Sequence, residues 1–566
     1  MGILRRYLPI LDWLPNYSKD QLSGDVNAGA VTAIMLVPQG MAYAMLAGLP
    51  PEVGLYASVL PLLLYAIFGS SRVMAVGPVA LVSLMVASTL NTLPVALAAD
   101  QMAGVAGLLA LMVGIISIGM GVFRLGFIVN FISHHVISGF TSAAALIIGF
   151  SQLKHLMGVN IPRSHNIFII LENAYADLTV LNGVSLAIGL GAIAILLFFK
   201  NNLGGFLAGT ATKAGPLVVV VLSTALVYAF GFDAGRGVKI VGEIPQGFTP
   251  FVLPHLDMSI IPALLPSAFL ISFVGFIESV SVAKVLASRR RQKIDPDNEL
   301  VGLGAANIGA ALSGGYPVTG GFSRSSVNFQ AGANTPLASM ITAVLVALTI
   351  VFFTPLFYYL PKAVLAAIIM VAVVNLIDIK AFGQAWRYSK SDAISLIGTF
   401  VAVLAVGIEK GLAFGVFITI AHYLWRANKP HVAIIGRVPK TEHFRNYLRH
   451  DVQREKAVTV ARIDESLFFA NVAWLETWAL HFIADNPDSR HMVLNCSGVN
   501  FIDGGALEVL ERLEEQLANA GVTLHLCEVK GPVMDRLKKS TFIDRLGPDR
   551  IYLSAHEAMT KLGYPI

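Results

Sequence analysis

The sequence has 566 residues, of which 55% are hydrophobic and only 13% are charged. Soluble globular proteins carry about 25% charged residues, so this composition indicates an integral membrane protein and excludes an ordinary soluble fold for most of the chain. The formal net charge of +5 is modest, and no basic run interleaved with aromatic residues suggests a nucleic-acid partner.

The apolar segments predict a multi-pass helical protein. The first residues, MGILRRYLPILDW, lack the long apolar stretch and the cleavage site of a signal peptide. A helix needs roughly 20 apolar residues to cross a bilayer, although several of the segments found here are shorter. We expect 14 spans, near 27–47, 54–68, 78–95, 103–122, 128–152, 178–198, 215–232, 260–286, 299–312, 323–333, 337–356, 361–377, 392–408 and 411–427.

Basic residues predict the orientation of these spans. An even number of spans places both termini on the same side of the membrane, and Lys and Arg favour the cytoplasmic side in short loops. The basic positions that precede the first span or follow even-numbered spans are Arg5, Arg6, Lys200, Lys213, Ser288–Lys293 and Lys380–Lys390. We therefore expect both termini in the cytoplasm and the loop 380–390 on that side.

Two segments do not fit a continuous span. GSSRVMAVGPVALVSLMV (69–86) and GGYPVTGGFSRSSVN (314–328) bring glycine, proline and polar residues to membrane depth. Non-helical backbone survives there only where it lines a cavity or is buried in protein. A pair of Gly/Pro-interrupted spans at corresponding places in two halves indicates a transporter's binding site. The third and tenth spans correspond in an inverted 7+7 repeat. The sequence therefore predicts two half-helices, starting near Pro78 and Ser323, whose N-termini together form an anion site.

Two charged residues lie within predicted spans. Arg324 follows the second interruption, and Glu278 lies inside the eighth span, well before the basic segment that ends it. A charged side chain in the membrane normally faces a partner or an aqueous cavity. One interpretation is a structural ion pair of Glu278 with Arg324 or Lys284. The other is a fixed positive charge that attracts an anion and a carboxylate that carries a proton. Glu409 is expected to sit in a loop with its neighbouring lysine.

Four segments resemble the signatures of a known family. They are VPQGMAYAMLAGLPPEVGLYAS (37–58), GSSRVMAVGP (69–78), ESVSVAK (278–284) and GGFSRSSVN (320–328). The chain is similar to the sulfate permease (SulP) anion transporters, and its C-terminal part resembles their STAS domain. The resemblance implies two intertwined inverted repeats like those of uracil permeases, with a core domain of spans 1–4 and 8–11 and a gate domain of spans 5–7 and 12–14. It also implies a homodimer and an elevator-like movement of core against gate.

The resemblance also implies which residues bind the anion. The family's site positions match Gln39, Tyr43, Val79, Ala80, Phe322, Ser323 and Arg324, with backbone N–H groups of the two half-helices holding the anion's oxygens. Sodium-coupled bicarbonate members carry aspartate at the position of Glu278, and the glutamate here favours proton coupling. No metal or other cofactor is implied.

The charge density divides the chain into two domains. It rises from about 9% in residues 1–427 to about 25% in residues 428–566, which is the soluble norm. We therefore expect a transmembrane domain over 1–427 and a cytoplasmic STAS domain over 428–566.

Within the second domain the pattern predicts alternating strands and helices, typical of an α/β layer fold. The expected elements are two strands within 457–472, a strand starting at 491, a helix over 505–521, a strand within 522–530 and a helix within 531–540. Cys496 and Cys527 are expected to be buried and reduced. Asp503 is followed by two glycines, so the phosphorylatable Ser or Thr of some members is missing, and a dimer or protein-partner surface is more consistent with the sequence.

The sequence therefore predicts a secondary active transporter and not an enzyme. We expect a proton-coupled sulfate importer in the plasma membrane, most simply the bacterial inner membrane, with sulfate and protons as its small partners. The alternatives are a sodium- or proton-coupled bicarbonate or C4-dicarboxylate carrier, an exchanger or channel-like anion protein of the same fold, and a non-transporting sensor.

Overall fold

The computed structural model describes residues 7–93, 99–131, 133–161, 167–202, 215–248 and 258–564, which are called the described residues below. The chain forms two compact units, Met1–Thr419 and Ile420–Ile566. Arg5, Arg6 and Lys213, on which part of the expected orientation depends, lie outside the described residues. The domain boundary after residue 427 remains a prediction from charge density.

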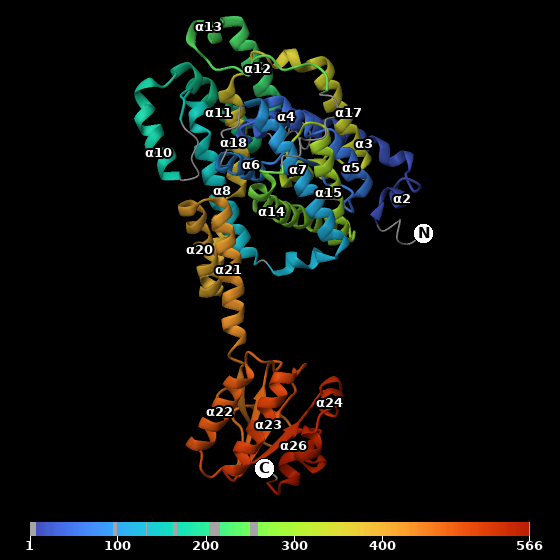
Figure 1. The fold of residues 1–566 in the computed structure, drawn as a ribbon, viewed down its shortest axis with the longest axis vertical. Helices are drawn as coiled ribbons and strands as arrows, with labels where there is room; N and C mark the ends of the chain where they lie inside the picture. The colour runs from blue at the N-terminus through green and yellow to red at the C-terminus, as the bar shows by residue number, and fades with distance from the viewer. Residues whose placement is uncertain are drawn as a thin grey trace. The chain divides into compact units, whose positions relative to one another are not determined.

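The first unit is helical (Figure 1). The helices at the expected spans are α3 (Lys19–Ala47), α4 (Pro51–Tyr56) with α5 (Leu60–Phe68), α6 (Ala80–Thr92), α7 (Ala99–Val122), α8 (His134–Ser151), α11 (Gly183–Asn202), α12 (Gly215–Phe230), α14 (Ile261–Ser288), α15 (Pro296–Leu312), α16 (Phe322–Gln330), α17 (Leu337–Leu348), α18 (Lys362–Val373), α20 (Lys390–Val406) and α21 (Ile408–Ala427). Shorter helices are α2 (Ile10–Trp13), α9 (Leu153–Leu156), α10 (Ile167–Ala176), α13 (Phe232–Arg236) and α19 (Ile379–Tyr388). Short 3-10 helices are η1 (Leu125–Phe131), η2 (Asp177–Val180), η5 (Thr354–Phe357) and η6 (Val374–Leu376), and η4 (Thr349–Phe353) is a short π-helix.

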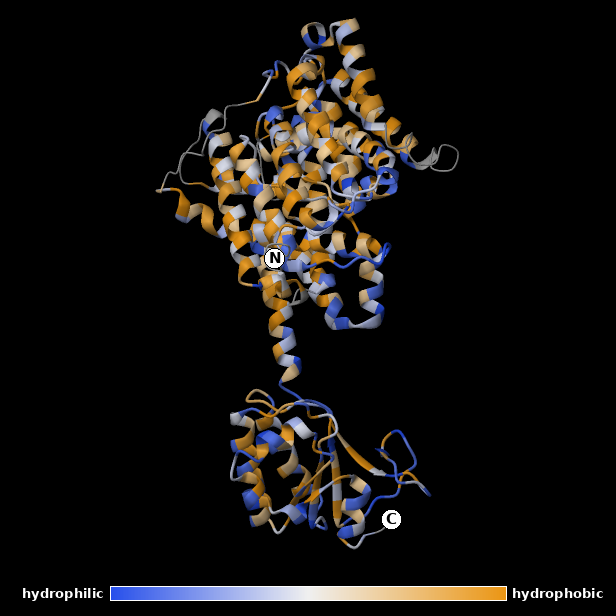
Figure 2. Cartoon of the chain, turned by 90° about the vertical axis from the view of Figure 1, so that its right-hand side faces the viewer, coloured by the Kyte–Doolittle hydropathy of each residue, from blue (hydrophilic) through white to orange (hydrophobic). Residues whose placement is uncertain are grey.

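These helices confirm a polytopic membrane fold. Each of the 14 expected spans coincides with a helix or a run of helices. By length and composition, eight helical runs of the described residues could cross a membrane, and α6 and α12 are shorter apolar helices. Figure 2 shows that hydrophobic residues colour most of these helices, while the second unit mixes both colours along its helices. Large apolar side chains such as Phe352 and Val221 are exposed, as lipid-facing residues must be.

The helices of the first unit pack in two groups. In one group α15 packs against α7 and α5, and α17 packs against α3. In the other group α8 packs against α20, and α11 packs against α18 and α12. The first group contains the expected core spans and the second contains expected gate spans. Helix α18 also contacts α3, which joins the two groups.

The two interrupted spans meet each other through a short β-ladder. Strand β1 (Val76–Gly77) pairs antiparallel with β2 (Thr319–Gly320), with Val76 opposite Gly320 and Gly77 opposite Thr319. Each strand is followed at once by a helix, α6 after β1 and α16 after β2. The antiparallel pairing is what an inverted repeat requires, because corresponding segments then run in opposite senses.

Buried polar side chains satisfy the extended backbone before β1. The Glu299 carboxylate on α15 accepts hydrogen bonds from the backbone N–H groups of Ser70 and Ser71, both at 2.9 Å, and from the Ser70 hydroxyl at 2.6 Å. Its other oxygen accepts from the Tyr65 hydroxyl at 2.7 Å. A charged group as deeply buried as Glu299 is tolerated only when its oxygens are bonded in this way. The carboxylate therefore fixes where the third span enters the membrane.

A matching set of bonds holds the segment around β2. The Asn307 side chain bonds both the N–H and the C=O of Val318, each at 2.9 Å. The Ser279 hydroxyl accepts from the Gly320 N–H at 2.8 Å and lies 2.7 Å from the Thr319 hydroxyl. A Cβ on Gly320 would clash with the side chains of Met74 and Ser279, so glycine allows the close approach of these groups. The unusual polar composition of 314–328 thus serves first to satisfy an interrupted backbone.

The prediction that residues 380–390 form a loop was wrong. Residues Ile379–Tyr388 form α19, which buries Ala381 and Ala385 and exposes Trp386 and Tyr388. Aromatic and basic residues spaced this way are typical of a helix lying at a membrane surface.

The second unit is a six-stranded sheet with helices (Figure 1). The strand order is β4-β3-β5-β6-β7-β8, and β5 to β8 are parallel. The strands are β3 (Val432–Arg437), β4 (Phe444–Asn446), β5 (Val458–Ile463), β6 (His491–Asn495), β7 (Thr523–Cys527) and β8 (Ile551–Tyr552). The helices are α22 (Val472–Asp485), α23 (Gly504–Asn519), α24 (Gly531–Leu537), α25 (Phe542–Leu546), η7 (Pro548–Arg550) and α26 (Ala555–Lys561).

The predicted α/β layer fold of the second unit is confirmed, but one of the predicted strands does not form. The second strand expected within 457–472 is reduced to a single bridge between Leu467 and Ile502. The Asn471 side chain bonds the backbone of Ser466 and Phe468, which turns the chain into α22 instead of extending it. Cys496 and Cys527 are free and buried, and burial raises the pKa of the Cys496 thiol to about 12.

A histidine pair, of which His525 is buried and His491 is half-buried, lies on the sheet of this unit. The Nδ1 atom of His491 on β6 lies 3.1 Å from the Nε2 atom of His525 on β7, and His525 is 4% exposed. Burial, assisted by the neighbouring His491 and Arg550, lowers the pKa of His525 to about 4. The folded unit therefore holds His525 neutral under conditions where an unfolded chain would protonate it.

We predict that this unit loses stability as the pH falls from about 6.5 toward 4, because the unfolded chain binds a proton there and the folded unit does not. The loss at pH 4 should reach up to about 3 kcal/mol, at roughly 1.4 kcal/mol per pKa unit. Urea unfolding of residues 430–566 across this window checks it. His525→Asn should flatten the pH dependence, and the exposed His481→Asn should leave it unchanged. An equally steep dependence in His525→Asn would contradict the assignment.

Candidate functional site

A cavity of about 600 Å³ lies between the two groups of helices in the first unit. One wall comes from α3, α6, α14 and α16, and the other from α11, α12 and α18 with η6. The structure brings all of the sequence-predicted site residues to this cavity, namely Gln39, Tyr43, Val79, Ala80, Glu278, Phe322, Ser323 and Arg324. They come from four segments that are far apart in the sequence.

The N-termini of α6 and α16 open onto the cavity. The N-cap of α6 is Val79 and that of α16 is Gly321, and neither side chain can accept a hydrogen bond. The first N–H groups of a helix have no partner within the helix, and the helix dipole adds partial positive charge there. Ala80, Phe322 and Ser323 are the first residues of these helices, and all three line the cavity. Two helix N-termini thus direct backbone donors toward one space.

Arg324 adds a fixed positive charge to the same place. Its side chain is 2% exposed, and its Nη1 donates to the carbonyl oxygen of Pro78 at the start of the opposite half-helix. Within the part of the chain that the structure describes, its Nε and Nη2 have no hydrogen-bond partner. A Cβ on Gly77 or Gly321 would lie within 3.4 Å of Nη2, so these glycines make room for the guanidinium. Unpaired guanidinium nitrogens in a buried position favour the approach of an anion.

Glu278 faces this cavity from α14. Its Oε2 is buried and has no hydrogen-bond partner, and among the described residues no ion pair joins it to Arg324 or Lys284. The structural ion pair considered from the sequence is therefore not present in this structure. An unpaired carboxylate beside a buried guanidinium can instead exchange a proton when the charge around it changes.

The sequence reasoning missed the polar residues on the opposite wall. Lys200 on α11 donates to the Oδ1 of Asn375 at 2.7 Å, and both residues line the cavity together with Gln330. In the sequence analysis Lys200 was used only to predict the orientation of the spans. The sequence could not place it in the cavity, because that depends on how α11 packs against α18. Among the described residues, no group of three or more His, Cys, Asp or Glu side chains could hold a metal ion.

Two known families match the chain, one within each of its two units. Residues 22–399 match the sulfate permease family, and residues 449–558 match the STAS domain. A probable sulfate transporter 4.2 of Arabidopsis thaliana is 36% identical over 97% of this chain and 83% of its own length. High affinity sulfate transporter 2 of Stylosanthes hamata is 32% identical over 99% of this chain and 87% of its own length.

Solved structures show the same fold. The murine solute carrier 26 family member A9 anion transporter, in an inward-facing state, aligns with a TM-score of 0.91 and 25% identity over 99% of this chain and 95% of its own. The transmembrane domain of the cyanobacterial bicarbonate transporter BicA aligns with a TM-score of 0.61 and 24% identity, over 71% of this chain and 98% of its own.

We predict that Arg324→Ala weakens sulfate binding by about 10- to 100-fold, the usual contribution of a hydrogen bond to a charged group. Both helix N-termini remain in this variant, so binding should be weakened and not abolished. Calorimetry on purified protein measures the change. Lys284→Ala removes an equal charge from α14 outside the cavity and should bind sulfate normally. Equal affinities for Arg324→Ala and the unmodified chain would remove Arg324 from the site.

Proposed function

Because this chain belongs to the sulfate permease family and carries a STAS domain, we propose that it is a proton-coupled sulfate importer. The family and the named relatives make it an anion transporter of this type and not an enzyme. Sulfate, protons and an elevator-like movement are our proposals for this chain.

The buried, incompletely bonded guanidinium of Arg324 supports an anionic substrate most directly. Two of its nitrogens have no hydrogen-bond partner among the residues that the structure describes, and two helix N-termini direct N–H groups into the same cavity. A compact dianion with several oxygens could accept from all of these donors at once. We therefore propose that the predicted residues Gln39, Tyr43, Val79, Ala80, Phe322, Ser323 and Arg324 form the sulfate site. The names of the plant relatives favour sulfate over bicarbonate or a C4-dicarboxylate.

Coupling would arise from Glu278. Binding of a dianion beside Arg324 offsets the positive charge that keeps a nearby carboxylate ionised, so it favours a proton on Glu278. A proton that enters with the anion also reduces the work of moving negative charge against a negative-inside potential, about 2.3 kcal/mol per charge per 100 mV. The carboxylate has no other hydrogen-bond partner for its Oε2, which leaves it available for this role.

The contact of α21 with the core helices supports movement of core against gate. Glu409 was expected in a loop, but it lies in α21, and its Oε1 accepts from Thr89 on α6 at 3.3 Å and from Ser267 on α14 at 3.1 Å. Helix α21 is an expected gate span, whereas α6 and α14 belong to the core. Ser267 lies near the N-terminal end of α14, the end opposite to the basic segment 288–293, and Thr89 lies near the C-terminal end of α6. We propose that they hold the cavity closed on the outer side.

The remaining parts of the proposal concern location and assembly. The described basic residues, Lys200 and the segment 288–293, follow even-numbered spans, which supports cytoplasmic termini. We propose a plasma membrane location, most simply the bacterial inner membrane. We further propose a homodimer and a cytoplasmic protein partner for the STAS domain. An exchanger or channel-like anion protein of the same fold is the alternative that the liposome experiment below distinguishes.

We predict that sulfate uptake into liposomes rises with an inward proton gradient and is indifferent to sodium. Glu278→Gln imitates a protonated carboxyl, so it should bind and exchange sulfate but lose gradient-driven accumulation. Labelled sulfate uptake with pH and sodium gradients imposed separately measures both. Exposed Glu243→Gln serves as the control and should accumulate sulfate normally.

Two results would contradict the coupling. Accumulation driven by sodium in the unmodified chain is one, and proton-driven accumulation that persists in Glu278→Gln is the other. Passive flux that never exceeds the electrochemical gradient would favour the channel-like candidate.

We predict that Glu409→Ala shifts the conformational equilibrium away from the closed outer side by roughly tenfold, because two hydrogen bonds of about 0.5–1.5 kcal/mol each are lost. Glu409→Gln keeps an oxygen acceptor and should shift it less. A cysteine placed at Val371, which lines the cavity on α18, reports the shift through its labelling rate from the inner side. Unchanged labelling in Glu409→Ala would show that the contact does not hold the two groups together.

A further inference from the structure

A second cavity of about 830 Å³ lies away from the proposed transport site. It is lined by α2, by the segment 69–72 that follows α5, and by the segment 292–298 that leads into α15. Helices α5 and α14 end beside it, and α15 and α17 begin there. Since membrane helices end at this level, the cavity lies at the depth of lipid headgroups. We call it the headgroup pocket, and its lining includes Trp13, Arg72, Lys293, Asp295 and Asn298.

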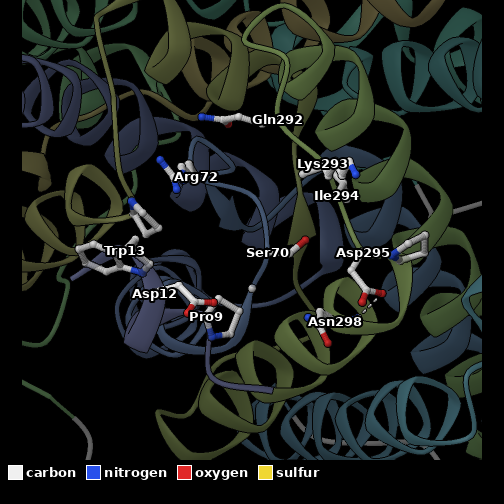
Figure 3. A pocket seen from close by; sticks show the side chains of 13 residues that line it. Pro9, Asp12, Trp13, Ser70, Arg72, Gln292, Lys293, Ile294, Asp295 and Asn298 are labelled. Carbon is white, nitrogen blue, oxygen red and sulfur yellow. Dashed lines mark hydrogen bonds between the residues drawn. The ribbon is translucent and has the colours of Figure 1, made fainter. Parts of the chain in front are cut away.

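The headgroup pocket contains two exposed cations, Arg72 and Lys293, together with the carboxylates of Asp12 and Asp295. Arg72 and Lys293 are exposed, and within the described residues neither has a hydrogen-bonded or ion-paired partner. Figure 3 shows Arg72, Gln292 and Lys293 along one side of the opening and Pro9, Asp12 and Asn298 along the other. The carboxylate of Asp295 is used as the N-cap of α15, where it accepts from the backbone N–H groups of Asp297 and Asn298. Arg72 and Lys293 are therefore available to a phosphate group.

Asn298 supplies an independent observation that points to a ligand. Its side chain is 7% exposed and lines the headgroup pocket, and its Oδ1 has no hydrogen-bond partner among the described residues. A buried polar atom without a partner costs roughly 1–3 kcal/mol, so native structures rarely leave one. An acceptor in this position is satisfied by a hydroxyl donor. The pocket thus offers two cations for a phosphate and an amide oxygen for a hydroxyl.

Apolar surface continues from the pocket toward the lipid. Trp13 is buried, and its Nε1 donates to the carbonyl oxygen of Ala66 at 3.4 Å, which fixes α2 against the end of α5. Leu11 on α2, Leu14 at its C-terminal cap and Leu22 on α3 are exposed. Acyl chains could lie along these residues while a headgroup occupies the pocket. A free phosphate compound would make no use of this apolar surface.

We propose that the headgroup pocket binds an anionic phospholipid whose headgroup carries free hydroxyls, of which phosphatidylglycerol is the simplest. Arg72 and Lys293 bind its phosphate, and Asn298 accepts from a headgroup hydroxyl. The lipid then ties α2 to the start of α15, next to the Glu299 bonds that fix the third span. This site requires no transport substrate, so it stands apart from the proposed sulfate site.

Binding of defined lipids to the purified full-length chain tests the proposal. Native mass spectrometry with short-chain phosphatidylglycerol gives the affinity, and phosphatidylcholine and glycerol 1-phosphate are the comparison ligands. The double variant R72Q/K293Q should bind phosphatidylglycerol about 30-fold more weakly, because each basic residue near a membrane surface contributes about a factor of five. Arg289→Gln removes an exposed arginine that does not line the pocket, and it should bind as the unmodified chain does.

The hydroxyl preference has its own test. The unmodified chain should prefer phosphatidylglycerol to phosphatidylmethanol, which has the same charge but no hydroxyl, and Asn298→Ala should lose this preference while still binding both. Equal loss in Arg289→Gln and the double variant would overturn the pocket as the site. Tighter binding of glycerol 1-phosphate than of phosphatidylglycerol would overturn the lipid as its occupant, and equal binding of phosphatidylcholine would overturn the role of charge.

Discussion

The antiparallel pairing of β1 with β2 is the contact on which the rest of the first unit depends. A membrane helix that is interrupted leaves backbone N–H and C=O groups that lipid cannot satisfy. Here the two interruptions satisfy each other through Val76–Gly320 and Gly77–Thr319, and side chains bond what remains. Glu299 holds the entry to β1, and Asn307 and Ser279 hold β2. Because the backbone groups of both interruptions must be hydrogen-bonded when they are buried, the two strands pair. The helices α6 and α16 that follow them therefore begin close to each other.

That arrangement also determines the electrostatics of the cavity. Two helix N-termini and Arg324 concentrate positive potential in a space from which water is partly excluded, where charges interact more strongly than in bulk water. Glu278 stands near this potential without being paired to it. A structure in which Arg324 and Glu278 neutralised each other would have little use for an anion. The unpaired state of both groups is the physical basis of our proposal that anion and proton move together.

The two groups of helices contribute different residues to the cavity. The core carries every residue of the proposed sulfate site, while α11, α12 and α18 close the cavity from the other side and contribute Lys200 and Asn375. The Glu409 contacts with Thr89 and Ser267 are polar contacts that would have to break for one group to move against the other. The headgroup pocket lies on core elements, so an occupying lipid would affect the position of the core and not the chemistry of the sulfate site.

The sequence by itself determined the class of fold and the positions of the two interrupted spans. Hydropathy and length predict the spans, because burial in lipid requires continuous apolar helices, and glycine, proline and Arg324 at membrane depth mark the interruptions. The resemblance to the sulfate permeases supplied Gln39, Tyr43 and the half-helix positions, which local pattern alone does not distinguish. Only the tertiary structure decided that Arg324 reaches Pro78 and not Glu278, that Glu409 bonds α6 and α14, and that Asn298 lines a second cavity. These contacts join residues far apart in sequence, and their geometry depends on how the helices pack, which no local pattern of residues encodes.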